Sequence, residues 1–205
     1  MKNPEKFIKA DNPLQLANSP EGSDAFFLAR LLNKNDGPHS LLHIARDDHR
    51  MSNMADLVTF FSPKTEVLIF PAWDCLPYDR ISPNPNISAQ RMTTLSKLAT
   101  DPTPTHKRIV ITTINAISQF LPEREILKDL SFLAKTGDRL DLERMTEFLS
   151  RNGYARSSTV MEHGDFAIRG GLIDIFPSGR ENPVRIDLWG DTIENMREFD
   201  PASQR

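Results

Sequence analysis

The sequence has a single cysteine and no long hydrophobic run. With one thiol, Cys75, the 205-residue chain cannot form an internal disulfide, which is typical of a reducing compartment. No apolar stretch approaches the roughly 18 residues that a membrane-spanning helix needs. The opening segment, MKNPEKFIKADNPLQL, also lacks the apolar centre of a signal peptide. We therefore expect a soluble, cytoplasmic protein with no membrane partner.

Positive charge is also scarce. The chain carries 25 Lys and Arg against 28 Asp and Glu, which gives a formal net charge of −3 and a pI near 6.0. Dedicated nucleic-acid-binding proteins usually show a basic excess, because they must neutralise phosphates. The composition therefore argues against that class, although a local basic face remains compatible with it.

Glycine is present but never at the spacing of a phosphate-binding loop. Such loops need glycines at fixed intervals, because backbone amides must approach the anion without an intervening Cβ atom. No two glycines lie five residues apart, as in GxxxxGK[ST], and no two lie two apart, as in GxGxxG. The nine positions are 22, 37, 137, 153, 164, 170, 171, 179 and 190. The sequence therefore predicts no nucleotide-hydrolysing site and no cofactor site of the usual kind.

No other catalytic or metal-binding arrangement is evident. His39 and His43 are four residues apart on an expected strand, and we interpret them as surface histidines rather than metal ligands. Glu162 and His163 could suggest a base, but no nucleophile accompanies them. Cys75 has no nearby histidine and is expected to be buried rather than reactive. We predict that this chain has no catalytic residues and binds no metal.

Helix and strand signals alternate through the first two thirds of the chain. Ser19 before Pro20 suggests the start of the first helix, since this order is common at helix amino ends. The expected order is helix, strand, helix, strand and helix, at 19–37, 39–47, 48–62, 65–73 and 87–100, followed at 107–118 by a strand that leads into a short helix. Alternation of this kind predicts a parallel sheet with helices on its faces. The proline-rich segment 74–86 between them is expected to pack as an ordered loop across the sheet's end.

The pattern changes near residue 128. A charged helix should begin after Asp141, a plausible cap, and stop at Gly153. Closely spaced strands follow, at 155–161, 165–179, 182–189 and 192–199. We therefore expect an α/β parallel-sheet domain over 1–128 and a small α+β domain over 129–205. Because the sequence stops just beyond a strand, we also expect a fragment of a longer protein.

Two arginines and a tryptophan interrupt the apolar strands between 166 and 189. Side chains alternate along a strand, so Arg185 and Trp189 should share one face, opposite the apolar residues Val184, Ile186 and Leu188. Gly190 with Asp191 would form a two-residue hairpin that leaves Trp189 near an exposed tip. The face that carries Arg185 and Trp189 should therefore present a guanidinium and an indole to solvent.

The preceding strand carries Arg169. The pair Gly170 and Gly171 is interpreted as a possible bulge, which leaves the register beyond it open. Asp174 could consequently pair with either Arg169 or Arg185.

Three interpretations of this face stay open from the residues alone. The arginines could simply be solvated and braced by Asp174 and Asp187. Alternatively, the face could bind a protein, because Arg and Trp are enriched at binding hot spots. Nucleic-acid binding is a third possibility, in which the arginines hold a phosphate and the tryptophan stacks on a base. Acidic neighbours such as Asp191 and Glu194 weaken this third interpretation.

Two long stretches carry a family resemblance. VMEHGDFAIRGGLIDIFPSGRENPVRIDLWGDTIENMREFDPASQR and FPAWDCLPYDRISPNPNISAQRMTTLSKL resemble the bacterial transcription-repair coupling factor (Mfd) family, and more loosely the repair protein UvrB. The likeness covers most of residues 35–205. It implies a RecA-like, helicase-type first domain whose nucleotide loop has degenerated at SPEGSDAFFLARLL, followed by a small domain that docks the damage sensor UvrA.

The resemblance also implies which residues bind. The family's UvrA contacts match Arg169, Arg185 and Trp189, although relatives commonly carry Phe at the third position. For the longer protein it implies an RNA-polymerase-binding domain and a double-stranded DNA translocase that uses ATP and magnesium. This chain is then expected to recruit UvrA to polymerase stalled at a lesion, without enzymatic activity or a cofactor of its own. The alternative is a DNA-binding module of a UvrB-like repair protein.

Overall fold

The computed structural model describes residues 17–20, 22–34, 36–75, 80, 82–177 and 179–205. These residues form two compact units, the first from residues up to 82 together with 101–121, and the second from 83–100 together with 122–205. Residues 83–100 therefore belong to the second unit, although they lie in the sequence between the two stretches of the first. The domain limit predicted at residue 128 stays a prediction. No described helix is long and apolar enough to cross a membrane.

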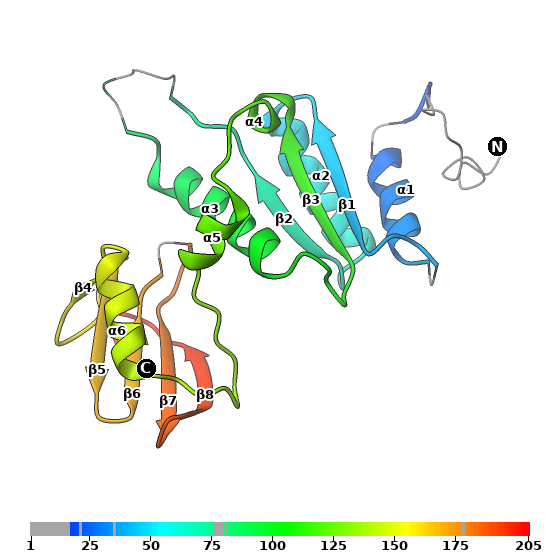
Figure 1. Ribbon diagram of the computed structural model, residues 1–205. Coiled ribbons are helices and arrows are strands. Elements are labelled where there is room, and N and C mark those ends of the chain that lie inside the picture. The colour runs from blue at the N-terminus through cyan, green and yellow to red at the C-terminus, as the bar shows by residue number, and fades with distance from the viewer. Residues whose placement is uncertain (1–16, 21, 35, 76–79, 81, 178) are drawn as a thin grey trace. The chain divides into compact units, whose positions relative to one another are not determined.

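The first unit is built on a three-stranded parallel sheet (Figure 1). Its strands are β1 (Ser40–Ala45), β2 (Glu66–Phe70) and β3 (Arg108–Thr113), in the order β1-β3-β2. Three helices belong to it: α1 (Ser23–Leu32), α2 (Asp48–Phe61) and the short α4 (Ile114–Ile117). The expected parallel α/β arrangement is confirmed.

Helices α1 and α2 bury one face of that sheet. Helix α2 packs against all three strands and α1 packs against α2, in a core that includes Ala25, Leu32, Met54, Val58, Ile109 and Ile111. Asp47 begins α2, because its carboxylate accepts the Arg50 amide hydrogen at 2.9 Å. Helix α1 starts later than predicted: its amino-terminal cap is Gly22 at φ 79°, and the hydroxyl of Ser23 donates to the Pro20 carbonyl.

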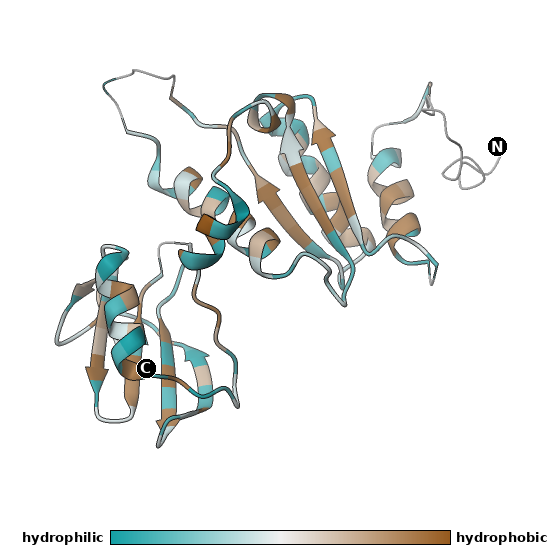
Figure 2. Ribbon diagram, viewed as in Figure 1, coloured by the Kyte–Doolittle hydropathy of each residue, from teal (hydrophilic) through white to brown (hydrophobic). Residues whose placement is uncertain are grey.

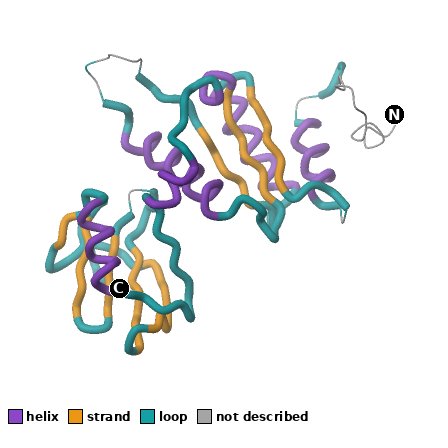
Figure 3. Tube along the Cα trace, in the orientation of Figure 1, coloured by secondary structure: helices purple, strands orange, loops and turns teal. Residues whose placement is uncertain are grey.

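The second unit combines three helices with a five-stranded sheet (Figure 3). The helices are α3 (Pro85–Thr100), α5 (Arg124–Asp129) and α6 (Leu142–Arg151). The strands are β4 (Ala155–Arg156), β5 (Asp165–Arg169), β6 (Leu172–Ile175), β7 (Val184–Trp189) and β8 (Thr192–Glu198), in chain order across the sheet. Only the pair β4–β5 is parallel. Strand β4 covers only two residues of the strand predicted over 155–161.

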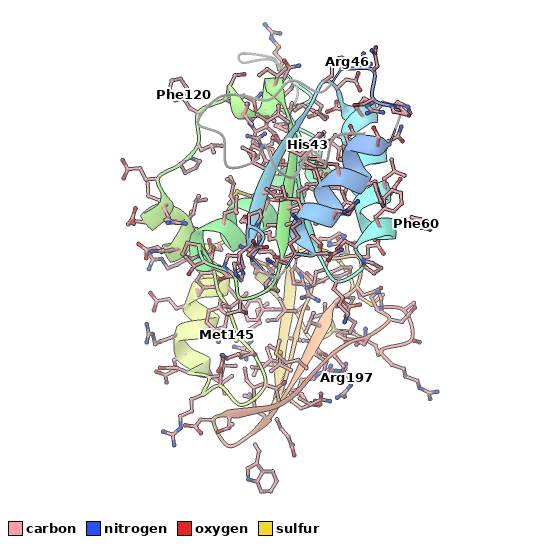
Figure 4. All side chains as sticks on the ribbon, turned by 90° about the vertical axis from the view of Figure 1, so that its right-hand side faces the viewer. His43, Arg46, Phe60, Phe120, Met145 and Arg197 are labelled. Atoms are coloured by element: carbon pink, nitrogen blue, oxygen red, sulfur yellow. The ribbon has the colours of Figure 1, made fainter. Side chains whose placement is uncertain are left out.

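Helix α6 covers one face of the five-stranded sheet. Met145 and Leu149 on the helix pack with buried strand residues Phe166, Ile173 and Ile186 (Figure 4 labels Met145). Asp141 caps the helix as predicted, accepting the amide hydrogens of Glu143 and Arg144 at 3.0 and 3.1 Å. The opposite face of the sheet is the one that carries the arginines.

The bulge predicted at Gly170 and Gly171 is wrong. Arg169 pairs directly with Leu172, so the two glycines are the turn of a tight hairpin between β5 and β6. A glycine suits this turn, because Gly170 adopts φ 59°. The sheet's irregularity lies instead between β7 and β8, where the register shifts after Asp187. Of the proline-rich segment 74–86, residues 76–79 and 81 lie outside the described residues, and α3 begins at its end.

Candidate partner-binding face of the five-stranded sheet

The hairpin registers bring the two predicted arginines to one face. Asp174 on β6 lies between Ala167 on β5 and Arg185 on β7, and Arg185 in turn lies opposite Arg197 on β8. We call this side of the sheet the arginine face; it comprises Ala167, Arg169, Leu172, Asp174, Arg185, Asp187, Trp189 and Arg197. Figure 2 shows hydrophilic and hydrophobic residues alternating along β7, as the sequence predicted.

A fully buried carboxylate lies at the centre of the arginine face. Asp174 has no exposed surface, and it pairs with both arginines rather than with one. Its Oδ1 accepts from Arg185 Nε at 2.7 Å, while its Oδ2 accepts from Arg185 Nη2 at 2.9 Å and from Arg169 Nη2. Bidentate guanidinium–carboxylate pairs are strong and geometrically specific. The open question of which arginine pairs with Asp174 is therefore answered: both do.

Arg185 is much less exposed than the sequence suggested. Only 13% of its side chain is accessible, because the turn after β8 lies over it. Its guanidinium carbon lies 4.4 Å from the centre of the Phe199 ring, and Nη1 donates to the Gln204 carbonyl at 3.1 Å. The hydrogen bonds to Asp174 raise the pKa of Arg185 above its ordinary value. The expectation of a solvated guanidinium was wrong here, since nothing in the strand pattern reveals the later turn.

Trp189 lies where the sequence placed it. It pairs with Thr192 across the two-residue turn of Gly190 and Asp191, and 81% of its surface is exposed. Gly190 adopts φ 64°, which most residues avoid. The predicted hairpin and its exposed indole are confirmed.

Two further residues of the arginine face, Leu172 and Arg197, were not predicted as part of it. Arg169 keeps 46% of its side chain accessible, and its neighbour Leu172 is 37% exposed despite being a large apolar residue. Asp187 pairs with Arg197 on β8, which Figure 4 labels. Had Gly170 and Gly171 been interpreted as a turn, Leu172 would have been placed beside Arg169 from the sequence alone.

The other sequence candidates lie apart from this face. His43 lies on the helix-covered side of β1 with Leu41 and Ala45, so it is half-buried rather than a surface residue as predicted. His163 packs its ring against Phe176 at 4.0 Å, and Cys75 is partly buried. Among the described residues, no group of three His, Cys, Asp or Glu side chains is arranged to hold a metal ion.

Most of the second unit matches a known domain family. Residues 132–205 match the family model of the UvrB interaction domain, and this range contains all five strands of the sheet and helix α6.

The chain as a whole is similar to transcription-repair-coupling factors. It is 32% identical to the protein of Haemophilus influenzae and 33% identical to that of Escherichia coli, over 97% of this chain in both cases. The Bacillus subtilis protein is 30% identical over 93% of the chain. Residues 132–205 thus belong to the UvrB interaction domain family, and the chain is a homologue of a segment of the transcription-repair coupling factors, as the resemblance predicted. It spans 16–17% of the length of these relatives.

Proposed function

We propose that the arginine face binds UvrA and thereby recruits this damage sensor for DNA repair. The observation that carries the proposal is the combination of a half-exposed Arg169 and an exposed Trp189 on one sheet, within residues that match the UvrB interaction domain family. Arginine and tryptophan are the residues most enriched in binding hot spots. A sheet already fixed by a buried ion cluster also loses little conformational freedom on binding.

The longer protein would couple this recruitment to transcription. The names of the relatives support a role in coupling transcription to repair, and we propose that the protein acts in the cytoplasm. We propose that further domains bind RNA polymerase and move along double-stranded DNA with ATP and magnesium, and that the segment described here has no catalytic part in that motion. We also propose that the first unit is a degenerate RecA-like domain, because its parallel sheet and covering helices lack a glycine-rich phosphate loop.

Purified UvrA is the direct test. We expect the wild-type chain to bind UvrA and the double variant Arg169→Ala, Arg185→Ala to bind at least about 30-fold more weakly, the loss typical of hot spots. Trp189→Ala should also weaken binding, and it leaves the buried ion cluster intact. Arg151→Ala is the matched control, since Arg151 is an exposed arginine on α6, which packs on the opposite side of the sheet. Undiminished binding by Trp189→Ala and by the double variant would remove the assignment of this face.

DNA binding is the second candidate, favoured by the three arginines of the same face. Phosphate contacts make affinity fall steeply as salt rises. A labelled duplex titrated at low and high salt separates the two proposals: salt-sensitive binding that disappears in Arg169→Ala would support direct DNA contact. We expect no such binding, because the carboxylates Asp174 and Asp187 offset most of the positive charge of this face, and a duplex is held by many phosphate contacts.

A further inference from the structure

Exposure divides the arginine face into two halves. In the covered half, Asp174 is fully buried and Arg185 is 13% accessible. In the open half, Leu172 is 37% exposed, Arg169 46% and Trp189 81%. The two arginines are therefore not equivalent, although the sequence pattern and the shared carboxylate make them look alike.

The covered half is closed by packing as well as by polar contacts. Phe199 is buried together with Val160, Ala167 and Phe176, which forms a small second core on this side of the sheet. Gln204 is anchored in turn, because its side-chain amide donates to the carbonyls of Val160 at 3.1 Å and Pro201 at 2.7 Å. A partner would have to displace this turn to make full contact with the Arg185 guanidinium.

We propose that a partner contacts only the open ridge formed by Arg169, Leu172 and Trp189, and that Arg185 acts as a positioning residue through Asp174. This inference rests on the proposed function, since it assigns roles within the same binding face. It adds Leu172 as a contact residue and removes Arg185 from direct contact.

The positioning role follows from the shared carboxylate. Arg185 occupies Oδ1 and shares Oδ2 of Asp174, so it supplies most of the compensation that a buried carboxylate needs. Arg169 contributes one Nη2 hydrogen bond and keeps nearly half of its side chain accessible. Without Arg185, Arg169 becomes the sole counter-charge of Asp174 and is drawn inward. The exposed donors that would meet a partner are then lost.

The open ridge also defines the chemistry of its partner site. Arg169 pairs across the hairpin with Leu172, and Leu172 lies opposite Asp187, two residues before Trp189 on β7. Arg169 is paired with Asp174 and Arg197 with Asp187, and both keep nearly half of their side chains accessible. Arg169 is the one that lies directly opposite the apolar Leu172, so it is the cation of the ridge. The ridge fits a partner surface that presents a carboxylate beside an apolar side chain.

A double-mutant cycle on UvrA binding separates the two roles of arginine. We expect Arg185→Leu to weaken binding by roughly tenfold when Arg169 is present, and to add little, less than about twofold, in an Arg169→Ala background. Direct contact by Arg185 would instead give the same loss in both backgrounds, and that result would overturn the inference.

Rescue by removal of the buried charge is the second measurement. In the double variant Arg185→Leu, Asp174→Asn, the neutral amide oxygen can still accept from Arg169 but no longer draws it inward. We expect this variant to recover most of the binding that Arg185→Leu loses. No recovery in a double variant that melts like the wild type would contradict the positioning role, since it would leave direct contact as the cause.

Leu172 tests the ridge without touching the ion cluster. Leu172→Ala should weaken UvrA binding by about fivefold or more. Leu133→Ala serves as the control, because Leu133 is 77% exposed and belongs to none of the strands. Equal binding by Leu172→Ala and wild type would remove Leu172 from the ridge. If the wild-type chain itself does not bind UvrA, the proposed function fails first, an outcome distinct from all of these.

Discussion

At the scale of single residues, Asp174 decides how the arginine face is built. Two guanidinium groups could repel each other on one sheet, yet a carboxylate with no exposed surface holds both. Buried charges are tolerated only when they are paired and hydrogen-bonded, which this arrangement satisfies. The first prediction concerns what happens when that central charge is lost.

Asp174→Ala should destabilise the second unit by about 3 kcal/mol, because it leaves the nearly buried Arg185 without its carboxylate. Asp187→Ala is the matched control on the same face: its partner Arg197 is half exposed, so the loss should stay below about 1 kcal/mol. Urea denaturation followed by circular dichroism measures both free energies of unfolding. Equal losses of unfolding free energy in the two variants would show that the buried Asp174 stabilises the unit no more than the more exposed Asp187 does.

A second residue-scale prediction concerns His43. Burial against α2 lowers its pKa, a nearby Arg50 adds to the lowering, and Asp24 opposes it. The folded state therefore disfavours the proton that the unfolded chain takes up below about pH 6.5. This contribution to stability is fully present above that pH and is lost as the pH falls towards the lower pKa of the folded state.

His43→Leu should make the stability of the first unit less dependent on pH between about 7 and 5. Urea titrations at several pH values, followed by Trp73 fluorescence in a Trp189→Phe background, would measure this. Trp73 belongs to the first unit, so the signal reports the unit that contains His43. Identical pH slopes with and without the substitution would contradict the burial effect.

At the scale of elements, helix ends and tight turns follow local chemistry closely. Asp141 accepts two backbone amides at the start of α6, and the hairpin of β7 and β8 turns at Gly190 with a positive φ. These features involve residues only a few positions apart, so the sequence predicts them well. The register of the strands beyond a turn is harder to predict. Gly170 and Gly171 illustrate this, because they were interpreted as a bulge and form a hairpin turn.

Asp141→Ala should destabilise the second unit by about 1 kcal/mol, because two amides at the start of α6 lose their acceptor. Glu147→Ala is the control on the same helix; it removes only an exposed pair with Arg151 and should cost a few tenths of a kcal/mol. Thermal melting of both variants distinguishes the two. A cap variant as stable as the control would mean that water replaces the aspartate without loss.

At the scale of the whole chain, the glycine spacing predicts that nucleotides do not bind and so do not change the chain's thermal stability. A ligand that binds only the folded state raises the melting temperature, and the rise grows with the logarithm of its concentration divided by its Kd. We therefore expect millimolar ATP with magnesium to leave the melting temperature unchanged. A clear upward shift would instead reveal a nucleotide site built without a glycine-rich loop.

Sequence alone was enough to predict the alternating elements of the first unit, the cap of α6, the exposed hairpin tip at Trp189 and the shared face of Arg185 and Trp189. These depend on side-chain periodicity and on contacts between near neighbours in the chain. The burial of Asp174 between both arginines, and the cover that Phe199 and Gln204 place over Arg185, became visible only in the folded chain. Burial depends on which distant segment packs over a strand, and alternation along one strand carries no information about that segment.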